Sequence, residues 1–339
     1  MLVSTALESR ASNVISKLMR VPIVRGATIE ILRRISRNAA VRTMCLKRGF
    51  LPLDVASIDY HSPVPDIDDL VARRIWDIRS ELGGIDFREQ AQLALLKTLG
   101  RNWGHECQWP WQPTPNPTEF YLGNPTFSFG CAASTHSMIR QFKPRSVIEI
   151  GSGMSSLVIA RALALNRKID EVPSEYLIVD PFPGSFIKQM REVTELRKQR
   201  VELLGPQFFD RLGRDSILFI DSSHTVRIGG DVNYLYLDIL PRLASGVIVH
   251  VHDIALPYNY SMSYVISESF RQFWTEQYLL QAFLCYNSEF EVLLAMGYLM
   301  IDHMKEFRAA YPTYDPKHDP YGGSGSFWLR RKIESGLAL

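Results

Sequence analysis

The sequence predicts an α/β protein built on a doubly wound sheet of seven strands, mostly parallel with an antiparallel last strand, after an N-terminal helical extension. The first observation is a series of five short segments rich in β-branched residues, most of them separated by helical patterns. The second is a pair of later strand candidates about 30 residues apart. The third is a glycine turn directly after the first strand. Strands that alternate with helices indicate βαβ units and a parallel sheet with helices on both faces.

The strand candidates are short apolar runs. The first five are Ser146–Ile150, Tyr176–Asp180, Val201–Leu204, Ser216–Asp221 and Gly246–Val251. Helical patterns separate most of them, at about 155–166, 185–199 and 230–243. A longer helical stretch over 263–284 precedes the last two strands, which are Phe290–Ala295 and Ser326–Arg331. This last pair can complete the sheet with an antiparallel edge strand.

We expect three zones along the chain. Residues 1–60 form a basic helical extension, in which Ile29, Leu32 and Ile35 recur at helical spacing. Residues 61–131 mix helix and loop and cover the active site. Residues 132–339 carry the sheet and its ligand site.

The middle zone contains two recognisable patterns. A helical pattern runs near 88–99, and a stretch rich in proline and aromatic residues runs from Trp109 to Pro117. Its prolines exclude a helix interior or a central strand. The stretch is either a loop that covers the substrate or a stiff connection packed on the body of the protein.

The net charge of +2 conceals an asymmetry. Residues 1–50 hold ten lysines and arginines against two acids, a net charge of +8, so the rest of the chain is −6. A basic head can contact anionic lipid or nucleic acid. A solvated helical arm and a mitochondrial-type presequence are the other interpretations of this segment. Because the sheet zone has no basic stripe interleaved with aromatic residues, we expect no nucleic-acid substrate.

Composition also indicates the compartment. No apolar run approaches the roughly 18 to 20 residues that a membrane-spanning helix needs, and the N-terminus has no signal-peptide pattern. The cysteines are Cys45, Cys107, Cys131 and Cys285, with no C-x-x-C pair among them. A cytoplasmic protein is the simplest expectation, with peripheral contact to an anionic membrane through residues 1–50.

The first strand ends in Val147-Ile-Glu-Ile-Gly-Ser-Gly-Met-Ser-Ser156. Gly151 and Gly153 allow a tight strand-to-helix turn and close approach of a ligand to the backbone. The free N–H groups of the following helix attract a carboxylate or phosphate. Ser156 stands where a third glycine belongs in a dinucleotide-binding turn, which counts against a pyrophosphate ligand.

Polar residues stand at three further strand ends. Asp180 ends the second strand, where an acid can accept hydrogen bonds from ribose hydroxyls; the alternative is an aspartate that starts a turn before proline. Asp221 and His224 follow the fourth strand, and His252 and Asp253 end the fifth. These strands should lie side by side, so the four side chains should converge and either perform acid–base chemistry or bind a divalent metal. Alternatively, Asp221 caps a helix and one histidine is structural.

The segment Glu149-Ile-Gly-Ser-Gly-Met-Ser-Ser resembles the first motif of class I methyltransferases that use S-adenosylmethionine (SAM). The resemblance implies a Rossmann-like fold and a cofactor site. The residues it assigns to SAM are Glu149, Gly151, Ser152, Gly153, Asp180 and Asp221. The segments Phe219-Ile-Asp-Ser-Ser-His and Gly246-Val-Ile-Val-His-Val-His-Asp-Ile resemble a bacterial branch associated with small molecules and sugars. Tyr60-His-Ser-Pro-Val-Pro-Asp66 resembles the entry segment of that branch.

A metal-dependent subset of this family carries acids at the ends of strands four and five. Asp221 and Asp253 match those positions, whereas His252 stands where the subset has a further acid. The resemblance therefore implies a mixed site for Mg²⁺ or Mn²⁺ made by Asp221, His252 and Asp253. Magnesium prefers oxygen ligands, so the histidine departs from the pattern.

The sequence thus predicts a SAM-dependent methyltransferase that methylates an oxygen of a small molecule or glycan. His224 or His252 is the expected general base, with Asp221 and Asp253 orienting it or binding metal. An NAD-dependent oxidoreductase on the same fold is one alternative. A non-catalytic membrane-surface protein with a Rossmann body is the other.

Overall fold

The computed structural model describes residues 61–266, 272–319 and 323–333. It also describes ten residues near the N-terminus: Val24, Ala27, Thr28, Glu30, Ile31, Arg34, Ile35, Ala40, Val41 and Met44. The chain divides into two units, Met1–Asp69 and Leu70–Leu339. Most of the basic residues predicted to contact a membrane lie outside the described residues.

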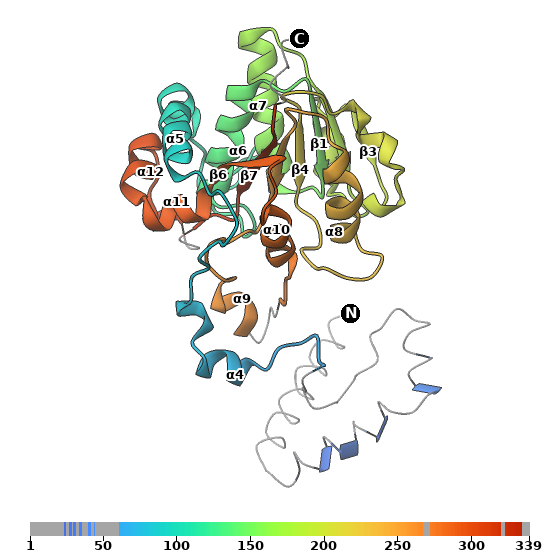
Figure 1. Ribbon diagram of the computed structural model, residues 1–339. Coiled ribbons are helices and arrows are strands. Elements are labelled where there is room, and N and C mark those ends of the chain that lie inside the picture. Colours follow the sequence, from blue (N-terminus) through green and yellow to red (C-terminus); the bar gives the residue numbers. More distant parts are fainter. Residues whose placement is uncertain are drawn as a thin grey trace, which may run out of the picture. The chain divides into compact units, whose positions relative to one another are not determined.

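The second unit is built on a seven-stranded sheet in the order β3-β2-β1-β4-β5-β7-β6 (Figure 1). The first five strands are parallel, and β7 pairs antiparallel with both β5 and β6. The predicted fold class is confirmed. The strands are β1 Ser146–Ile150, β2 Glu175–Val179, β3 Glu195–Arg197, β4 Ile217–Ile220, β5 Ile248–Val251, β6 Phe290–Ala295 and β7 Phe327–Arg331.

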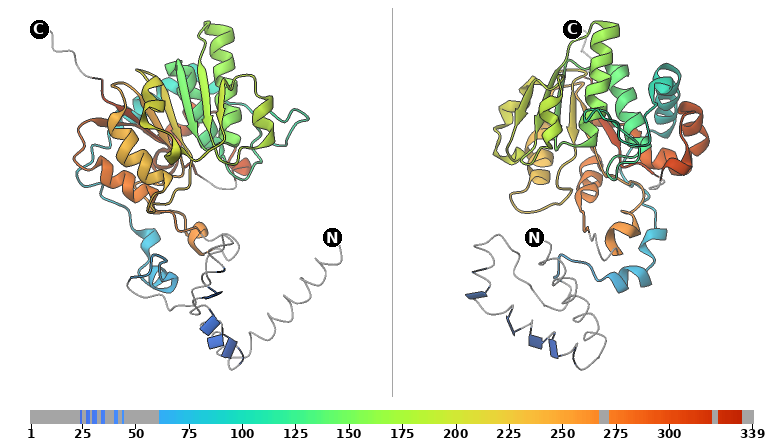
Figure 2. Two further views of the ribbon diagram at one scale, coloured as in Figure 1. Left: turned by 90° about the vertical axis from the view of Figure 1, so that its right-hand side faces the viewer. Right: turned by 180° about the vertical axis from the view of Figure 1, so that it is seen from behind.

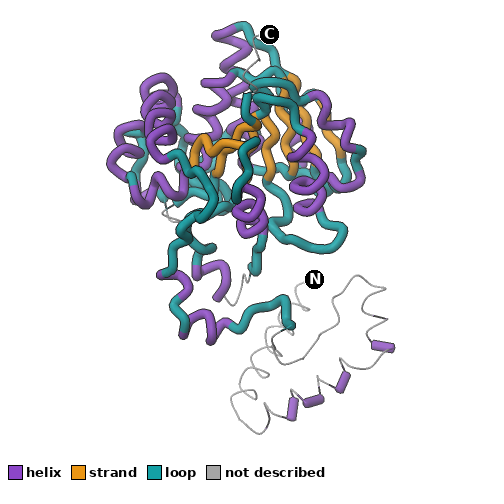
Figure 3. Tube along the Cα trace, in the orientation of Figure 1, coloured by secondary structure: helices purple, strands orange, loops and turns teal. Residues whose placement is uncertain are grey.

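Helices pack on both faces of this sheet (Figures 1 and 2). The α-helices are α4 Ile67–Ala72, α5 Glu89–Trp103, α6 Phe129–Phe142, α7 Met154–Asp170, α8 Asp231–Tyr234, α9 Met262–Ile266, α10 Glu276–Leu284, α11 Met296–Asp302 and α12 Met304–Ala310. Short 3₁₀ turns lie at Ile75–Asp77, Gly104–Glu106, Ser185–Gln189, Val201–Leu203, Pro206–Arg211, Leu240–Arg242 and Pro316–His318. Long loops join these elements (Figure 3).

The central strands explain why the sheet forms here. Every residue of β1, β4 and β5 is buried. Parallel strands that are covered on both faces require such continuous apolar runs, because neither face meets water. Helices α5, α6 and α7 pack in a row, with α6 and α7 on one face, whereas α8 and α10 lie over the other. The carboxyl ends of β1, β2, β4 and β5 are therefore held side by side.

The third strand was predicted in the wrong place. Val201–Leu204 is not a strand, since Val201–Leu203 forms a 3₁₀ turn that buries Val201 in the core. The strand is Glu195–Arg197, inside the stretch predicted to be helical at 185–199. It has three residues at the sheet edge, and pairing with β2 creates it rather than an apolar run of its own.

Two other helical predictions hold only in part. The pattern at 230–243 begins as α8, widens into a π-helical turn over Leu235–Ile239 and ends at a 3₁₀ turn containing Pro241. Proline lacks the N–H that a continuing helix requires. The stretch at 263–284 holds two separate helices, α9 and α10, instead of one.

Helix α6 has no counterpart among the sequence predictions. Twelve of its residues are buried, so it lacks the polar face by which an amphipathic helix is recognised. The side chain of Ser128 caps it by accepting a hydrogen bond from the backbone N–H of Cys131. Helix α6 also crosses the expected zone boundary between residues 131 and 132.

The stretch from Trp109 to Pro117 packs on the body of the protein at its first residue. The Trp109 ring meets Phe120 and Phe129 edge-on, with centroids 5.5 and 6.0 Å apart. None of residues 109–117 is among the described residues that line the two cavities presented below, and Pro125 is the first of those along the chain. In the described part of the chain, no helix is long and apolar enough to cross a membrane.

Candidate active site

The glycine turn after β1 depends on the absence of a side chain at Gly151. Its φ is +83°, and a Cβ there would lie 1.8 Å from the carbonyl oxygen of Asp221. The Gly151 N–H donates to the Val179 carbonyl, and the Asp221 N–H donates to the Ile150 carbonyl, both at 2.9 Å. The turn is thus fixed between the ends of β2 and β4.

Glu149 supports this turn from inside the protein. Its side chain is fully buried and accepts hydrogen bonds from Ser155 at 2.6 Å, from Ser156 at 2.8 Å and from Tyr176. Burial raises the pKa of Glu149 to about 7, and the three hydroxyl donors oppose that rise. Glu149 therefore braces the start of α7, and it is not among the residues that line the cavity beside the turn.

Asp180 and Ser152 meet at the other side of the turn. The Ser152 hydroxyl donates to Oδ2 of Asp180 at 2.5 Å, and the Phe182 N–H donates to Oδ1 at 2.6 Å. Both carboxylate oxygens are thereby oriented. Asp180 is buried and is not among the described residues that line the two cavities below. The neighbouring Phe182 side chain is 90% exposed, so a large aromatic surface stands beside this acid.

Two cavities adjoin at the carboxyl edge of the sheet. The larger, of about 640 Å³, is lined by residues of the glycine turn, including Ser152, Gly153 and Ser155, and by Asp221 and Trp274. The smaller, of about 280 Å³, lies beside Cys131 and Ser324. Both are lined by Pro125, Thr126, His252, Asp253 and Tyr264.

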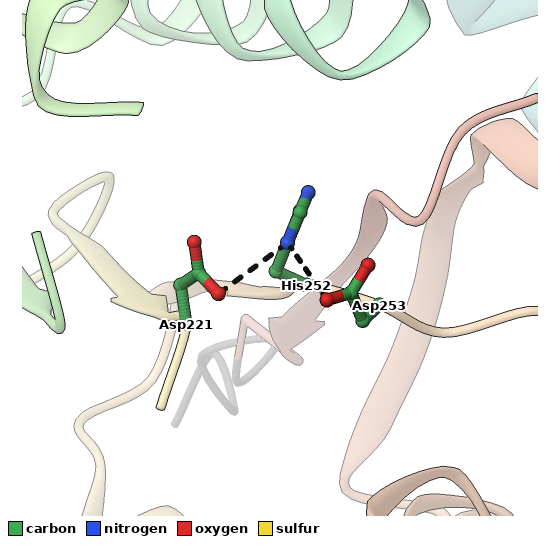
Figure 4. A group of neighbouring side chains, drawn as sticks. All are labelled: Asp221, His252 and Asp253. Atoms are coloured by element: carbon green, nitrogen blue, oxygen red, sulfur yellow. Dashed lines mark ion pairs between the residues drawn. The ribbon is translucent and has the colours of Figure 1, made fainter. Parts of the chain in front are cut away.

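The four predicted strand-end residues converge beside these cavities, as expected. His252 Nδ1 lies 3.4 Å from Asp221 Oδ1 and 3.6 Å from Asp253 Oδ2 (Figure 4). His224 Nε2 lies 3.3 and 3.4 Å from the same two carboxylate oxygens. Two imidazoles therefore share two carboxylates.

Comparison with known proteins gives this arrangement a chemical context. Residues 148–254, which run from β1 through β5 and include all four residues of the cluster, match the model of a methyltransferase domain. This segment belongs to the methyltransferase-domain family. The chain is a SAM-dependent methyltransferase. It is also similar to an uncharacterized protein of Archaeoglobus fulgidus, with 28% identity over 166 residues, covering 47% of this chain and 73% of the relative.

In this methyltransferase, His224 is paired with Glu276, a residue that was not predicted from the sequence. Glu276, the first residue of α10, is fully buried and lies 2.8 Å from His224 Nδ1 through its Oε2. Burial lowers the pKa of His224, but hydrogen bonds with Asp221 and Glu276 outweigh it and raise that pKa to about 10. His224 is therefore protonated at neutral pH, unlike an unperturbed imidazole. It is not among the residues that line either cavity.

Cys131 is the second partner that sequence reasoning missed. Its Sγ lies 3.3 Å from His252 Nε2 and 3.2 Å from the Ser324 hydroxyl. Burial raises the pKa of this thiol, but the charge of His252 and the hydrogen bonds with His252, Ser128 and Ser324 together outweigh burial and lower the pKa to about 7. No sequence pattern links the two residues, because Cys131 precedes His252 by 121 positions.

The backbone is unusual at two of the cluster residues. His224 and Asp253 have φ values of +56° and +54°, in the left-handed region that residues with a Cβ rarely adopt. Such conformations cost on the order of 1 kcal/mol or more and gather at functional sites. The side chains of both residues belong to the cluster in which two imidazoles share two carboxylates.

The donor set can be tested against a metal ion. Asp221, His252 and Asp253 each offer one ligand atom, and the three atoms lie within 4.8 Å of one another. Nδ1 of His252 is buried and makes no hydrogen bond of good geometry, but it lies at ion-pair distance from both carboxylates, at 3.4 and 3.6 Å. Two oxygens and one nitrogen suit Mn²⁺ or another transition ion better than Mg²⁺. The same carboxylates already face His224, which offers them a positive charge in place of an ion.

Proposed function

We propose that this methyltransferase transfers the methyl group of SAM to an oxygen of a small molecule or glycan. One observation carries the proposal: the cavity beside the glycine turn and the smaller cavity share His252 and Asp253. With SAM in the first cavity and the acceptor in the second, the reacting atoms meet at these two side chains. Direct displacement depends on such alignment.

The larger cavity takes SAM in this proposal. The glycine turn and the start of α7 receive the methionine carboxylate, since backbone N–H groups at a helix start attract anions. Asp180 is not among the described lining residues of this cavity, but it is hydrogen-bonded to Ser152, which is; we place the ribose hydroxyls on Asp180, where the ligand extends past Ser152. The exposed ring of Phe182 can stack on the adenine.

The shared residues take up the acceptor's proton: as the acceptor oxygen displaces S-adenosylhomocysteine from the methyl carbon, the Asp253 carboxylate accepts the hydroxyl proton beside the charged His252. Asp253 and His252 line both cavities, so they are the proposed catalytic residues in contact with the acceptor hydroxyl. Asp221 lines the cofactor cavity and completes the carboxylate pair. His224 touches neither ligand and acts as a positioning residue, because Glu276 fixes its ring and its Nε2 holds both carboxylates.

A metal-dependent version uses the same residues. Asp221, His252 and Asp253 would hold the ion, which when bound would favour the anionic form of the acceptor oxygen. We favour the metal-free version, because two imidazoles already balance the charge of the two carboxylates.

The proposal is tested by following S-adenosylhomocysteine (SAH) formation from SAM with hydroxylated acceptors. Asp253→Asn should lower transfer by roughly 100-fold, the scale of acid–base catalysis, while SAH still binds. Asp215→Asn is the matched control, because Asp215 also has a positive φ, of +63°, but lines neither cavity. Transfer at the parent rate in Asp253→Asn would remove this residue from the mechanism.

The basic segment at residues 1–50 gives a second proposal about location. Its charge of +8 favours peripheral contact between an otherwise cytoplasmic enzyme and anionic lipid. Replacing Arg33, Arg34 and Arg37 with Gln should reduce co-sedimentation with phosphatidylserine vesicles and leave SAH binding unchanged. Equal vesicle binding by parent and variant contradicts the proposal.

A further inference from the structure

The described walls of the smaller cavity offer no unpaired positive charge. Neither lysine nor arginine is among its described lining residues, and the one carboxylate there belongs to Asp253. The imidazole of His252 also lines the cavity, but its charge is already paired with Asp221 and Asp253. A phosphate or carboxylate group on a ligand normally needs a cation or several N–H donors to replace its hydration. Here an anionic ligand would instead meet a carboxylate.

Arg79 contacts Tyr258, one of the lining residues, and its charge is already paired. Its guanidinium lies 5.5 Å from the Tyr258 ring centroid and 2.8 Å from Asp302. Tyr258 itself donates a hydrogen bond to Asp302 at 2.6 Å. Arg79 does not line the cavity, so it supplies no anion site there.

The cavity walls are aromatic rings whose polar atoms are largely occupied. The Tyr260 hydroxyl accepts a hydrogen bond from the Gln277 N–H at 3.1 Å. The Tyr260 and Tyr264 rings both pack edge-on against Trp274, with centroids 5.8 and 5.1 Å apart. These walls therefore offer ring faces and edges more than hydrogen-bonding groups.

Small polar groups lie on another part of the cavity lining. Ser128, Ser324 and His252 each contact the Sγ atom of Cys131 there. At about 280 Å³, the cavity is just below the roughly 300–1,000 Å³ of typical ligand sites. One ring with a few hydroxyl groups fits this volume and this combination of surfaces.

We propose that the acceptor is an uncharged, hydroxylated single ring, either a phenol or a sugar, and that the cavity rejects acceptors carrying a carboxylate or phosphate. This inference rests on the proposed function, because it assigns the smaller cavity to the acceptor. The inference goes further than the proposed function because it specifies the charge and the size of the acceptor that enters the smaller cavity.

The test is equilibrium binding of probe pairs to the full chain saturated with SAH. One pair is catechol and 3,4-dihydroxybenzoate, and the other is methyl glucoside and methyl glucuronide. The neutral member of one pair should bind at least about tenfold more tightly than its anionic partner, a difference of about 1.4 kcal/mol. The pair that binds distinguishes a phenol from a sugar.

A charge introduced at Ile301 supplies the converse experiment. Ile301 lines the cavity and is 56% exposed, so a lysine can be accommodated there. Ile301→Lys should improve binding of the anionic probe by about tenfold, and the uncharged control Ile301→Met should not.

Equal binding of both members of a pair, binding of neither neutral probe, or no gain in Ile301→Lys would each overturn the inference. Failure of SAH itself to bind would instead refute the cofactor site, so the two failures are distinguishable.

Discussion

Nδ1 of His224 lies 2.8 Å from Oε2 of Glu276, a carboxylate with no exposed surface. The backbone reinforces this contact, because the N–H groups of Thr275 and Glu276 both donate to the His224 carbonyl. The start of α10 is thus tied to the loop after β4, on the side of His224 away from the two shared carboxylates. Glu276 keeps the imidazole charged and fixes where its other nitrogen points.

Replacing Glu276 with glutamine tests this role. The change keeps the shape but removes the negative charge, so the pKa of His224 should fall from about 10. We expect kcat to fall roughly 10- to 100-fold, the scale for a hydrogen bond to a charged group, with SAH affinity unchanged. Imidazole titration by NMR and the pH–rate profile measure the effect. Glu195→Gln is the control, because that carboxylate pairs with Arg197 and Arg211 outside the site. An unchanged His224 titration would contradict the assignment.

The two glycines of the turn should respond differently to alanine. Gly151→Ala places a Cβ 1.8 Å from a backbone oxygen at positive φ and should destabilise the fold by roughly 3 kcal/mol or more. Gly153 has no atom within 4 Å of an added Cβ, so its variant should stay within about 1 kcal/mol of the parent. Because Gly153 lines the larger cavity, SAH affinity should fall by about tenfold. Urea unfolding and calorimetry separate the two effects. Parent-like SAH binding by Gly153→Ala would place the cofactor elsewhere.

Chelation distinguishes the two versions of the chemistry. In the metal-free version, excess EDTA leaves turnover unchanged, whereas His252→Gln lowers it by roughly 100-fold. Loss of turnover with EDTA, reversed by Mn²⁺, would establish the metal-dependent version. SAH binding measured in parallel checks that the cofactor cavity is intact under both conditions.

Acid should weaken the fold through Glu106. This carboxylate lies 2.8 Å from His136 and 2.9 Å from Arg140. Burial raises its pKa, but these two hydrogen bonds outweigh burial and lower it to about 2, below the ordinary 4.5. The resulting stability is present above about pH 4.5 and is lost as the pH falls towards 2, on the order of 2 kcal/mol.

Urea unfolding at pH 7 and pH 3 measures this contribution. Glu106→Gln should lose less stability over that interval than the parent does. Glu119→Gln, which changes an exposed carboxylate bonded to Thr114, should behave like the parent. Equal losses in parent and Glu106→Gln would show that Glu106 does not contribute.

The strongest elements could be predicted because their signal is local. The strands β1, β2, β4 and β5 are short, mostly apolar runs, and each prediction agrees with the structure to within one or two residues. The polar residues that end them converge because parallel strands bring their carboxyl ends together. The edge strand Glu195–Arg197 has no such run, and α6 has no polar face, so neither produces a recognisable pattern.

The partners of the cluster could not be predicted, because they come from remote segments. Glu276 follows His224 by 52 residues, and Cys131 precedes His252 by 121. Residue type alone does not distinguish Glu276 from other acids at helix starts. Glu149 could be singled out because it directly precedes the glycine turn. Its structural role in that turn, through hydrogen bonds with Ser155, Ser156 and Tyr176, could not be predicted.

The central claim is that SAM lies in the cavity between the glycine turn and the shared carboxylates, with its ribose on Asp180. Calorimetric titration of SAH into the parent, Asp180→Ala and Ser152→Ala tests it most directly. The account predicts binding to the parent and a loss of about 1.5–3 kcal/mol in Asp180→Ala, the scale of hydrogen bonds to a charged group. A smaller loss is expected in Ser152→Ala, because Ser152 only orients the acid. SAH binding by Asp180→Ala as tight as by the parent would contradict the account.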